Sequence, residues 1–100
     1  MKRHFIIIIT YTVPFEQLSE HIDAHRAFLQ TGYVRGQLLM SGPQNPKVGG
    51  IVIARGPSLE QIKQFMADDP YMKRGVAKYQ FIEFEPLKSQ SFLGDWIAGS

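Results

Sequence analysis

The stretch that decides the fold runs from His21 to Pro43 and reads HIDAHRAFLQTGYVRGQLLMSGP. Within it and just before it, apolar residues recur at helical spacing: Phe15, Leu18, Ile22 and Leu29. This spacing predicts an amphipathic helix that buries one stripe in a core. His25 fills the gap in that stripe, so we expect its titratable ring to face the interior. An imidazole in that place needs a hydrogen-bonding partner or a function.

The predicted helix runs from about Phe15 to Thr31. Pro14 suits the first turn of a helix, and we expect Gly32 to end it, because glycine favours the position past the last turn. A strand from Tyr33 to Ser41 then leads into a segment dense in turn-forming residues, 42–46.

Upstream, the continuous apolar run from His4 to Tyr11 predicts a central strand buried on both faces. This run is too short for a signal peptide, and no small-residue cleavage site follows it. No segment approaches the roughly 20 apolar residues of a membrane span. We therefore expect a cytoplasmic protein that does not engage a membrane.

Downstream, the pattern predicts a third strand over Ile51–Ala54, antiparallel to the second, and a fourth over Ala77–Pro86. A second helix is predicted between them, from Leu59 to about Asp68. Ser58 and Gln61 have the spacing of a capping box at its start. The order strand, helix, strand, strand, helix, strand is the split βαβ arrangement, an α+β antiparallel sheet with both helices on one face.

The predicted sheet leaves its second face uncovered, and a homodimer is the usual way to bury such a face. We expect one domain over residues 1–86. The tail, 87–100, has apolar residues at the spacing of a short helix, which would pack on this subunit or on its partner.

Composition narrows the class of function. The chain has 100 residues, a net charge of +2 and no cysteine. The small charge, without basic clusters, argues against nucleic-acid binding. The absence of cysteine excludes disulfides, a thiol nucleophile and a cysteine-based metal site. No hydrolase elbow, phosphate-binding loop or dinucleotide fingerprint is present, so we expect no cofactor.

Asp69 is the expected partner of His25. It continues the core stripe of the second helix, which consists of Leu59, Ile62 and Met66. It lies near the C-terminal end of that helix, where the helix dipole disfavours a carboxylate. An imidazole oriented by an aspartate is a general-base arrangement. Two other interpretations stay open: His25 hydrogen-bonds within the core, and Asp69 begins a turn before Pro70.

Other residues near these two are weaker candidates. His21 and His25 are four residues apart, but Asp23 points to the other side of the helix, so we predict no metal site. Arg26 either binds an anionic substrate or is solvated. The Ser41-Gly42-Pro43 segment either receives a ligand, through a hydroxyl and a close backbone approach, or simply ends a strand.

Several short motifs, in this order, resemble the YciI-like (YCII-related) family from roughly Phe5 to Pro86: AHRAFL at 24–29, GY at 32–33, SGP at 41–43, GG at 49–50 and DPY at 69–71 with Gly75. The resemblance implies a ferredoxin-like, dimeric α+β barrel fold and an active site of one histidine and one aspartate. By motif, these are His25 and Asp69. Ser41, Gly42, Pro43, Arg26 and Tyr71 are the residues we expect to contact the substrate.

The chain departs from this family at Ile22, where many members have an arginine three residues before the histidine. One relative is a dehydrochlorinase that acts on a chlorinated hydroxyquinone. Our first hypothesis is a cofactor-independent lyase or isomerase that uses general-base catalysis on a small cyclic or aromatic molecule. The alternatives are a non-catalytic metabolite-binding or accessory protein, and a dimeric scaffold with His25 and Asp69 as a buried structural pair.

Overall fold

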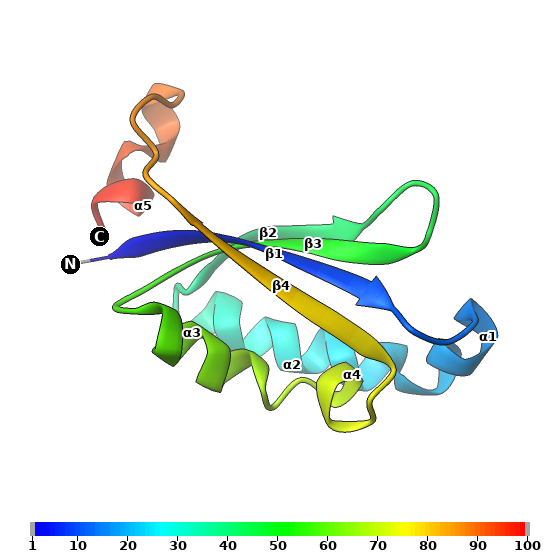
Figure 1. Cartoon of the computed structure of the whole chain (residues 1–100). Coiled ribbons are helices and arrows are strands. Elements are labelled where there is room, and N and C mark those ends of the chain that lie inside the picture. Colours follow the sequence, from blue (N-terminus) through cyan, green and yellow to red (C-terminus); the bar gives the residue numbers. More distant parts are fainter. Residues whose placement is uncertain (1, 100) are drawn as a thin grey trace.

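The computed structural model describes residues 2–99 and has a four-stranded antiparallel sheet with the main helices on one face (Figure 1). Its strands are β1 (Arg3–Tyr11), β2 (Leu38–Pro43), β3 (Gly49–Gly56) and β4 (Ala77–Phe84). Its helices are α1 (Phe15–Leu18), α2 (Ile22–Val34), α3 (Leu59–Met66), α4 (Pro70–Lys73) and α5 (Gly94–Ala98). The strand order is β2-β3-β1-β4. The predicted α+β class and split βαβ topology are therefore confirmed.

Strand β1 lies at the centre of the sheet, between β3 and β4. Phe5, Ile7 and Ile9 are buried beneath the helices, where each such side chain stabilises the fold by about 1.5–3 kcal/mol. Ile6 and Ile8 point to the other face and are only partly buried. The prediction of burial on both faces was therefore wrong for the single chain, because no helix covers most of that second face.

The predicted helix over Phe15–Thr31 is divided in two. Helix α1 ends at Leu18, a 3₁₀ turn covers Ser19–His21, and α2 begins at Ile22. Phe15 is 44% exposed and does not belong to the buried stripe.

Gly32 does not end the helix as predicted. It is buried inside α2, where an added Cβ would lie 2.8 Å from side-chain atoms of Leu38 and Phe65. The helix continues to Val34, and Gly36, with φ +74°, provides the left-handed conformation after its end. Because Gly32 has no side chain, α2 can pack closely against β2 and α3 at this position.

Other element boundaries also differ from prediction. Strand β2 begins at Leu38, because α2 occupies the start of the predicted strand. Strand β3 runs from Gly49 to Gly56 and is therefore longer than the predicted Ile51–Ala54. At its start Gly49 pairs with β1, and the two backbones lie too close together for a side chain at this position. Strand β4 ends at Phe84, two residues before Pro86.

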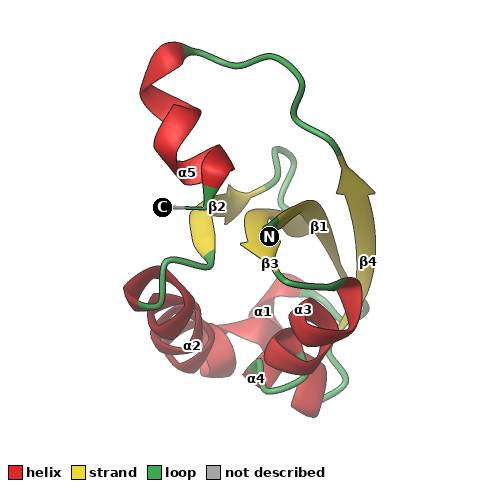
Figure 2. Cartoon of the chain, turned by 90° about the vertical axis from the view of Figure 1, so that its left-hand side faces the viewer, coloured by secondary structure: helices red, strands yellow, loops and turns green. Residues whose placement is uncertain are grey.

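The C-terminal segment lies on the face of the sheet opposite α2 and α3 (Figures 1 and 2). A 3₁₀ turn over Ser91–Leu93 precedes α5. The Trp96 ring packs against His4, with ring centroids 5.6 Å apart, and the Arg55 guanidinium lies 4.9 Å from the centre of the indole. Arg55 also donates a hydrogen bond to the carbonyl of Trp96. The segment therefore packs on its own chain.

No helix within residues 2–99 is both long and apolar enough to cross a membrane. The cytoplasmic location inferred from the sequence stays a prediction.

Candidate active site

His25 and Asp69 meet beneath the sheet, although 44 residues separate them in the sequence. His25 lies in the first turn of α2, and Asp69 lies between α3 and α4. The imidazole Nδ1 is 2.8 Å and 2.9 Å from the two carboxylate oxygens. The Asp69 side chain is 0% exposed and that of His25 is 13% exposed. The predicted pair is therefore in direct contact and almost enclosed.

The stripe predicted that Asp69 lies at the C-terminal end of the second helix, but in the structure it lies beyond that end. Helix α3 ends at Met66, and the backbone of Asp69 is extended. Its carboxylate caps the next helix, α4, by accepting a hydrogen bond from the Tyr71 N–H at 3.1 Å. Pro70 occupies the first helical position, where its missing N–H is harmless. Asp69 therefore forms the turn before Pro70 and also contacts His25.

Tyr79, which the sequence reasoning missed, completes the surroundings of the carboxylate. It lies on β4, and its hydroxyl donates to Asp69 Oδ2 at 2.5 Å. Donors from His25, the Tyr71 backbone and Tyr79 thus surround a buried carboxylate, which would otherwise be strongly destabilising. Local sequence pattern could not have found Tyr79, because its side chain faces Asp69 only through the pairing of Tyr79 with Ile9, which places it on the helix-covered face.

The hydrogen bond to Asp69 determines which imidazole nitrogen is available. An ionised carboxylate only accepts hydrogen bonds, so beside such a carboxylate the neutral form of His25 carries its proton on Nδ1 and its lone pair on Nε2. Within residues 2–99 the structure gives Nε2 no hydrogen-bond partner. The Tyr71 ring stacks on the imidazole, and Tyr11 packs edge-on against Tyr71. The ring of His25 is therefore held in one orientation with Nε2 unused.

The neighbouring phenols are shifted toward their neutral form. Burial raises the pKa of Tyr71 to about 12, and the charges of Tyr11 and Asp69 add to the shift while Arg26 opposes it. Burial, followed by the hydrogen bond to Asp69, raises the pKa of Tyr79 further. Burial also raises the pKa of Tyr11. At neutral pH these hydroxyls can donate hydrogen bonds but do not serve as bases.

A small cavity of about 100 Å³ borders Tyr71. Side chains from β1, α1, α2, α4 and the β2–β3 region line it, namely Tyr11, Phe15, Ile22, Arg26, Pro43, Lys47 and Tyr71. Three predicted contact residues are thus brought together: Arg26, Pro43 and Tyr71. Lys47 was missed, because nothing in the turn-forming segment indicates which way its side chain points. The cavity has two cations and no carboxylate in its lining, so it is suited to an oxygen-rich or anionic molecule.

The structure places Ser41 and Gly42 elsewhere. The Ser41 hydroxyl is 2.6 Å from the hydroxyl of Tyr33. Ser41 and Gly42 border a different hollow, of about 310 Å³, together with Met40 and Ile51. They are therefore not grouped with Arg26 and Tyr71 in the lining of the small cavity.

No three histidine, aspartate or glutamate side chains within residues 2–99 gather as a metal ion would require. His21 instead borders a surface hollow with Asp68 and Lys73.

The chain is similar to a known protein family in sequence and to a solved protein in structure. The sequence matches the family model of the YCII-related domain over residues 4–85. A comparison with curated proteins found no match. Among solved structures, the chain is similar to the 5-chloro-2-hydroxyhydroquinone dehydrochlorinase of Burkholderia phenoliruptrix AC1100, in complex with 2,5-dihydroxybenzoquinone. The sequences are 18% identical, the TM-score is 0.68, and the match covers 89% of this chain and 97% of that one. At this identity the likeness establishes the fold alone.

Proposed function

This chain belongs to the YCII-related domain family, and from that premise we propose that it is a small enzyme in which His25 is a general base oriented by Asp69. The observation that carries the proposal is the 2.8 Å contact between His25 Nδ1 and a fully buried carboxylate. This contact leaves Nε2 as the basic atom. It also provides a negative charge that stabilises the imidazolium formed when Nε2 takes a proton.

The proposed reaction begins when Nε2 removes a proton from a carbon or a hydroxyl of the substrate. In an elimination, the electrons of that C–H or O–H bond form a double bond and the leaving group departs with its own electron pair. From a hydroxylated aromatic ring this requires the keto tautomer, in which the carbon that carries the leaving group is sp³. In an isomerisation, the imidazolium returns the proton to another carbon. Atoms and electrons balance in both reactions without a redox partner. General-base catalysis of this type contributes about 10²–10⁴-fold to the rate.

The substrate we propose is a small cyclic or aromatic molecule that carries a hydroxyl or anionic oxygen. The aromatic rings of Tyr11 and Tyr71 and the cations of Arg26 and Lys47 in the lining of the adjacent cavity support this class. The cavity is smaller than the roughly 150 Å³ that an apolar cavity needs to hold benzene. We therefore expect the exposed Phe15 ring to move when substrate enters. The role of Ser41 in positioning a substrate oxygen stays a prediction.

The test begins with the compounds named for the structural neighbour. Chloride release from 5-chloro-2-hydroxyhydroquinone and binding of 2,5-dihydroxybenzoquinone are measured first, followed by a screen of related hydroxylated rings. We expect His25→Ala to keep its circular dichroism spectrum and lose turnover by about 10²–10⁴-fold. His21→Ala is the control, because His21 ends the 3₁₀ turn just before α2 and has no hydrogen bond to Asp69 in the structure.

Two outcomes would contradict the proposal. A substrate turned over equally by the wild type and His25→Ala would remove His25 from the mechanism. Binding without turnover across the whole screen would favour the alternative of a metabolite-binding protein.

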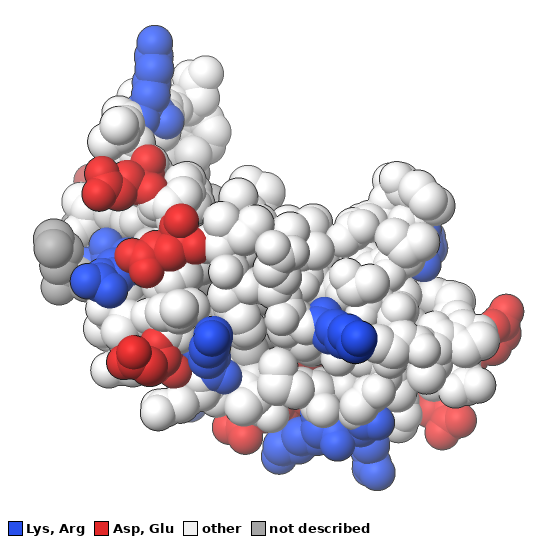
Figure 3. All heavy atoms as spheres, viewed as in Figure 1, with Lys and Arg blue, Asp and Glu red and all other residues white. Residues whose placement is uncertain are grey.

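We also propose that two copies pair through the sheet face opposite α2 and α3. Large apolar side chains are exposed there, including Met40, Ile82 and Phe84, and Ile6 and Ile8 are only partly covered. In Figure 3 the upper edge of the molecule is hollowed between the C-terminal segment and the β2–β3 turn, and uncharged atoms line the hollow. A second copy offers the same apolar face, which a two-fold pairing would bury.

A further inference from the structure

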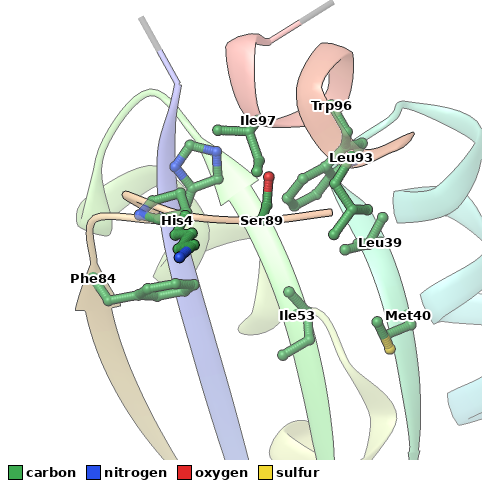
Figure 4. Close-up of a pocket in the computed structure, with 11 residues that line it drawn as sticks. His4, Leu39, Met40, Ile53, Phe84, Ser89, Leu93, Trp96 and Ile97 are labelled. Atoms are coloured by element: carbon green, nitrogen blue, oxygen red, sulfur yellow. The ribbon is translucent and has the colours of Figure 1, made fainter. Parts of the chain in front are cut away.

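Another cavity, larger than the one beside Tyr71, lies under the C-terminal segment, on the face of the sheet opposite His25 (Figure 4). Its volume is about 270 Å³. Strand residues form one side and the C-terminal segment forms the other, and the apolar lining includes Met40, Ile53, Phe84, Leu93, Trp96 and Ile97. The cavity exceeds the roughly 150 Å³ that suffices for benzene in an apolar protein interior. It is therefore large enough for a substituted aromatic ring.

His4 provides the unusual polar group of this cavity. The residue is 6% exposed, and its Nε2 is buried without a hydrogen-bond partner within residues 2–99. Its ring packs between aromatic neighbours, with Phe84 edge-on at 6.5 Å and Trp96 tilted at 5.6 Å. Buried polar atoms in folded proteins are nearly always paired, so an unpaired one calls for a ligand or a water molecule.

We propose that this cavity binds a small phenol, with the aromatic ring against Trp96 and Phe84 and the hydroxyl paired with His4 Nε2. That atom has almost no accessible surface in the structure, so the imidazole turns toward the cavity when the phenol enters. A hydroxyl can donate or accept, so it satisfies Nε2 in either tautomer of the imidazole. An aromatic ring suits walls that are themselves aromatic and aliphatic. A carboxylate buried at His4 would need a full counter-charge there, whereas Lys88 borders the cavity from an exposed position.

The site is separate from the proposed active site, and the C-terminal segment forms one of its walls. Leu93, Trp96 and Ile97 lie outside residues 4–85, the range that matches the family. The sheet separates the cavity from His25, because His4 and Ile53 point to the face that α2 and α3 do not cover. The inference therefore does not depend on the proposed catalysis. It does require that the proposed pairing of two copies, which would also contact Met40 and Phe84, leaves this cavity open.

The experiment uses the indole N–H resonance of Trp96, the single tryptophan of the chain, in nuclear magnetic resonance titrations of the full-length protein. The probes are para-cresol and toluene, which differ only by the hydroxyl group. We expect both to shift the resonance and para-cresol to bind roughly tenfold more tightly, because only its hydroxyl pairs with the buried nitrogen.

His4→Phe keeps a ring in place and removes the nitrogen, so we expect it to abolish the preference for para-cresol while toluene binding changes little. Ile97→Phe narrows the cavity and should weaken both probes, whereas Val34→Phe, on the exposed side of α2, should weaken neither. Equal affinity of the wild type for the two probes would overturn the proposal. So would a preference that survives in His4→Phe. An indole resonance that neither probe shifts would show that the cavity is closed or filled by a second copy, which also overturns it.

Discussion

The ring of Tyr71 lies parallel to the imidazole of His25, with ring centroids 3.9 Å apart and an angle of 4° between the planes. The backbone N–H of the same tyrosine donates to Asp69, the carboxylate that accepts from His25. The short segment 69–71 therefore contacts the imidazole twice, through the stacked ring of Tyr71 and through the hydrogen bond between Asp69 and Nδ1. This arrangement reduces the freedom of the ring before any ligand arrives, which is what an oriented general base requires.

Tyr79→Phe should destabilise the protein by about 1.5–3 kcal/mol, because a hydrogen bond to a buried charged group is lost and Asp69 Oδ2 is left with less compensation. Urea unfolding followed by circular dichroism measures the change. Tyr33→Phe is the matched control, since its hydroxyl pairs with an exposed serine and its loss should cost under about 1 kcal/mol. Equal losses of unfolding free energy in the two variants would show that the hydrogen bond to Asp69 stabilises the fold no more than the exposed one does.

Alkaline pH should weaken the fold. The pKa of Tyr71 is raised to about 12 and that of Tyr79 is raised further, whereas both titrate near 10.0 in the unfolded chain. Above pH 10 the unfolded chain releases protons that the folded protein keeps, so the free energy of unfolding falls as pH rises. The contribution is complete below pH 10 and is lost toward pH 12 and beyond.

Urea midpoints measured at a series of pH values test this expectation. Tyr79→Phe removes one of the shifted phenols, so its midpoints should decline less steeply. A wild type whose midpoint stays constant between pH 10 and pH 12 would contradict the direction of these shifts.

Gly32→Ala should destabilise the protein by about 1–3 kcal/mol. The added methyl group would lie 2.8 Å from Leu38 and Phe65, and inserting volume into a filled contact forces the neighbours apart. The thermal midpoint reports the loss. Gly94→Ala is a control at another helical glycine, where an added Cβ meets nothing within 4 Å, and should be neutral or slightly stabilising. A neutral Gly32→Ala would mean that α2 can move away from β2 without loss.

Ile82→Glu should separate the proposed dimer. Ile82 is 39% exposed on the uncovered sheet face, and a glutamate there would be buried without a partner in a paired assembly. Light scattering after size exclusion should give twice the chain mass for the wild type and the chain mass for the variant. Gln64→Glu adds the same charge at an exposed position of α3, away from the proposed interface, and should remain dimeric. A wild type that is monomeric at high concentration would dispose of the pairing.

Several features of this protein were predictable from local sequence pattern. The alternation of strands and helices indicates the topology, because periodicities of two and near 3.6 residues report which side of each element is buried. The same reasoning placed His25 and Asp69 inward from separate helices. The rule that both crossovers lie on one side of the sheet put the two residues on the same face, which made their contact an expectation. The pair was thus the part of the candidate site that pattern alone could locate.

Only the tertiary structure decided what depends on distances between segments far apart in the chain. Gly32 looks like a helix end locally, but its place is decided by Leu38 and Phe65, which approach too closely for any side chain. Asp69 continues a helical stripe by spacing, yet Pro70 and the hydrogen bond from Tyr71 start a new helix there. The hydrogen bond from Tyr79 likewise depends on where β4 lies beside β1. Spacing reports which way a residue faces, whereas its partner is determined by the packing of the whole chain.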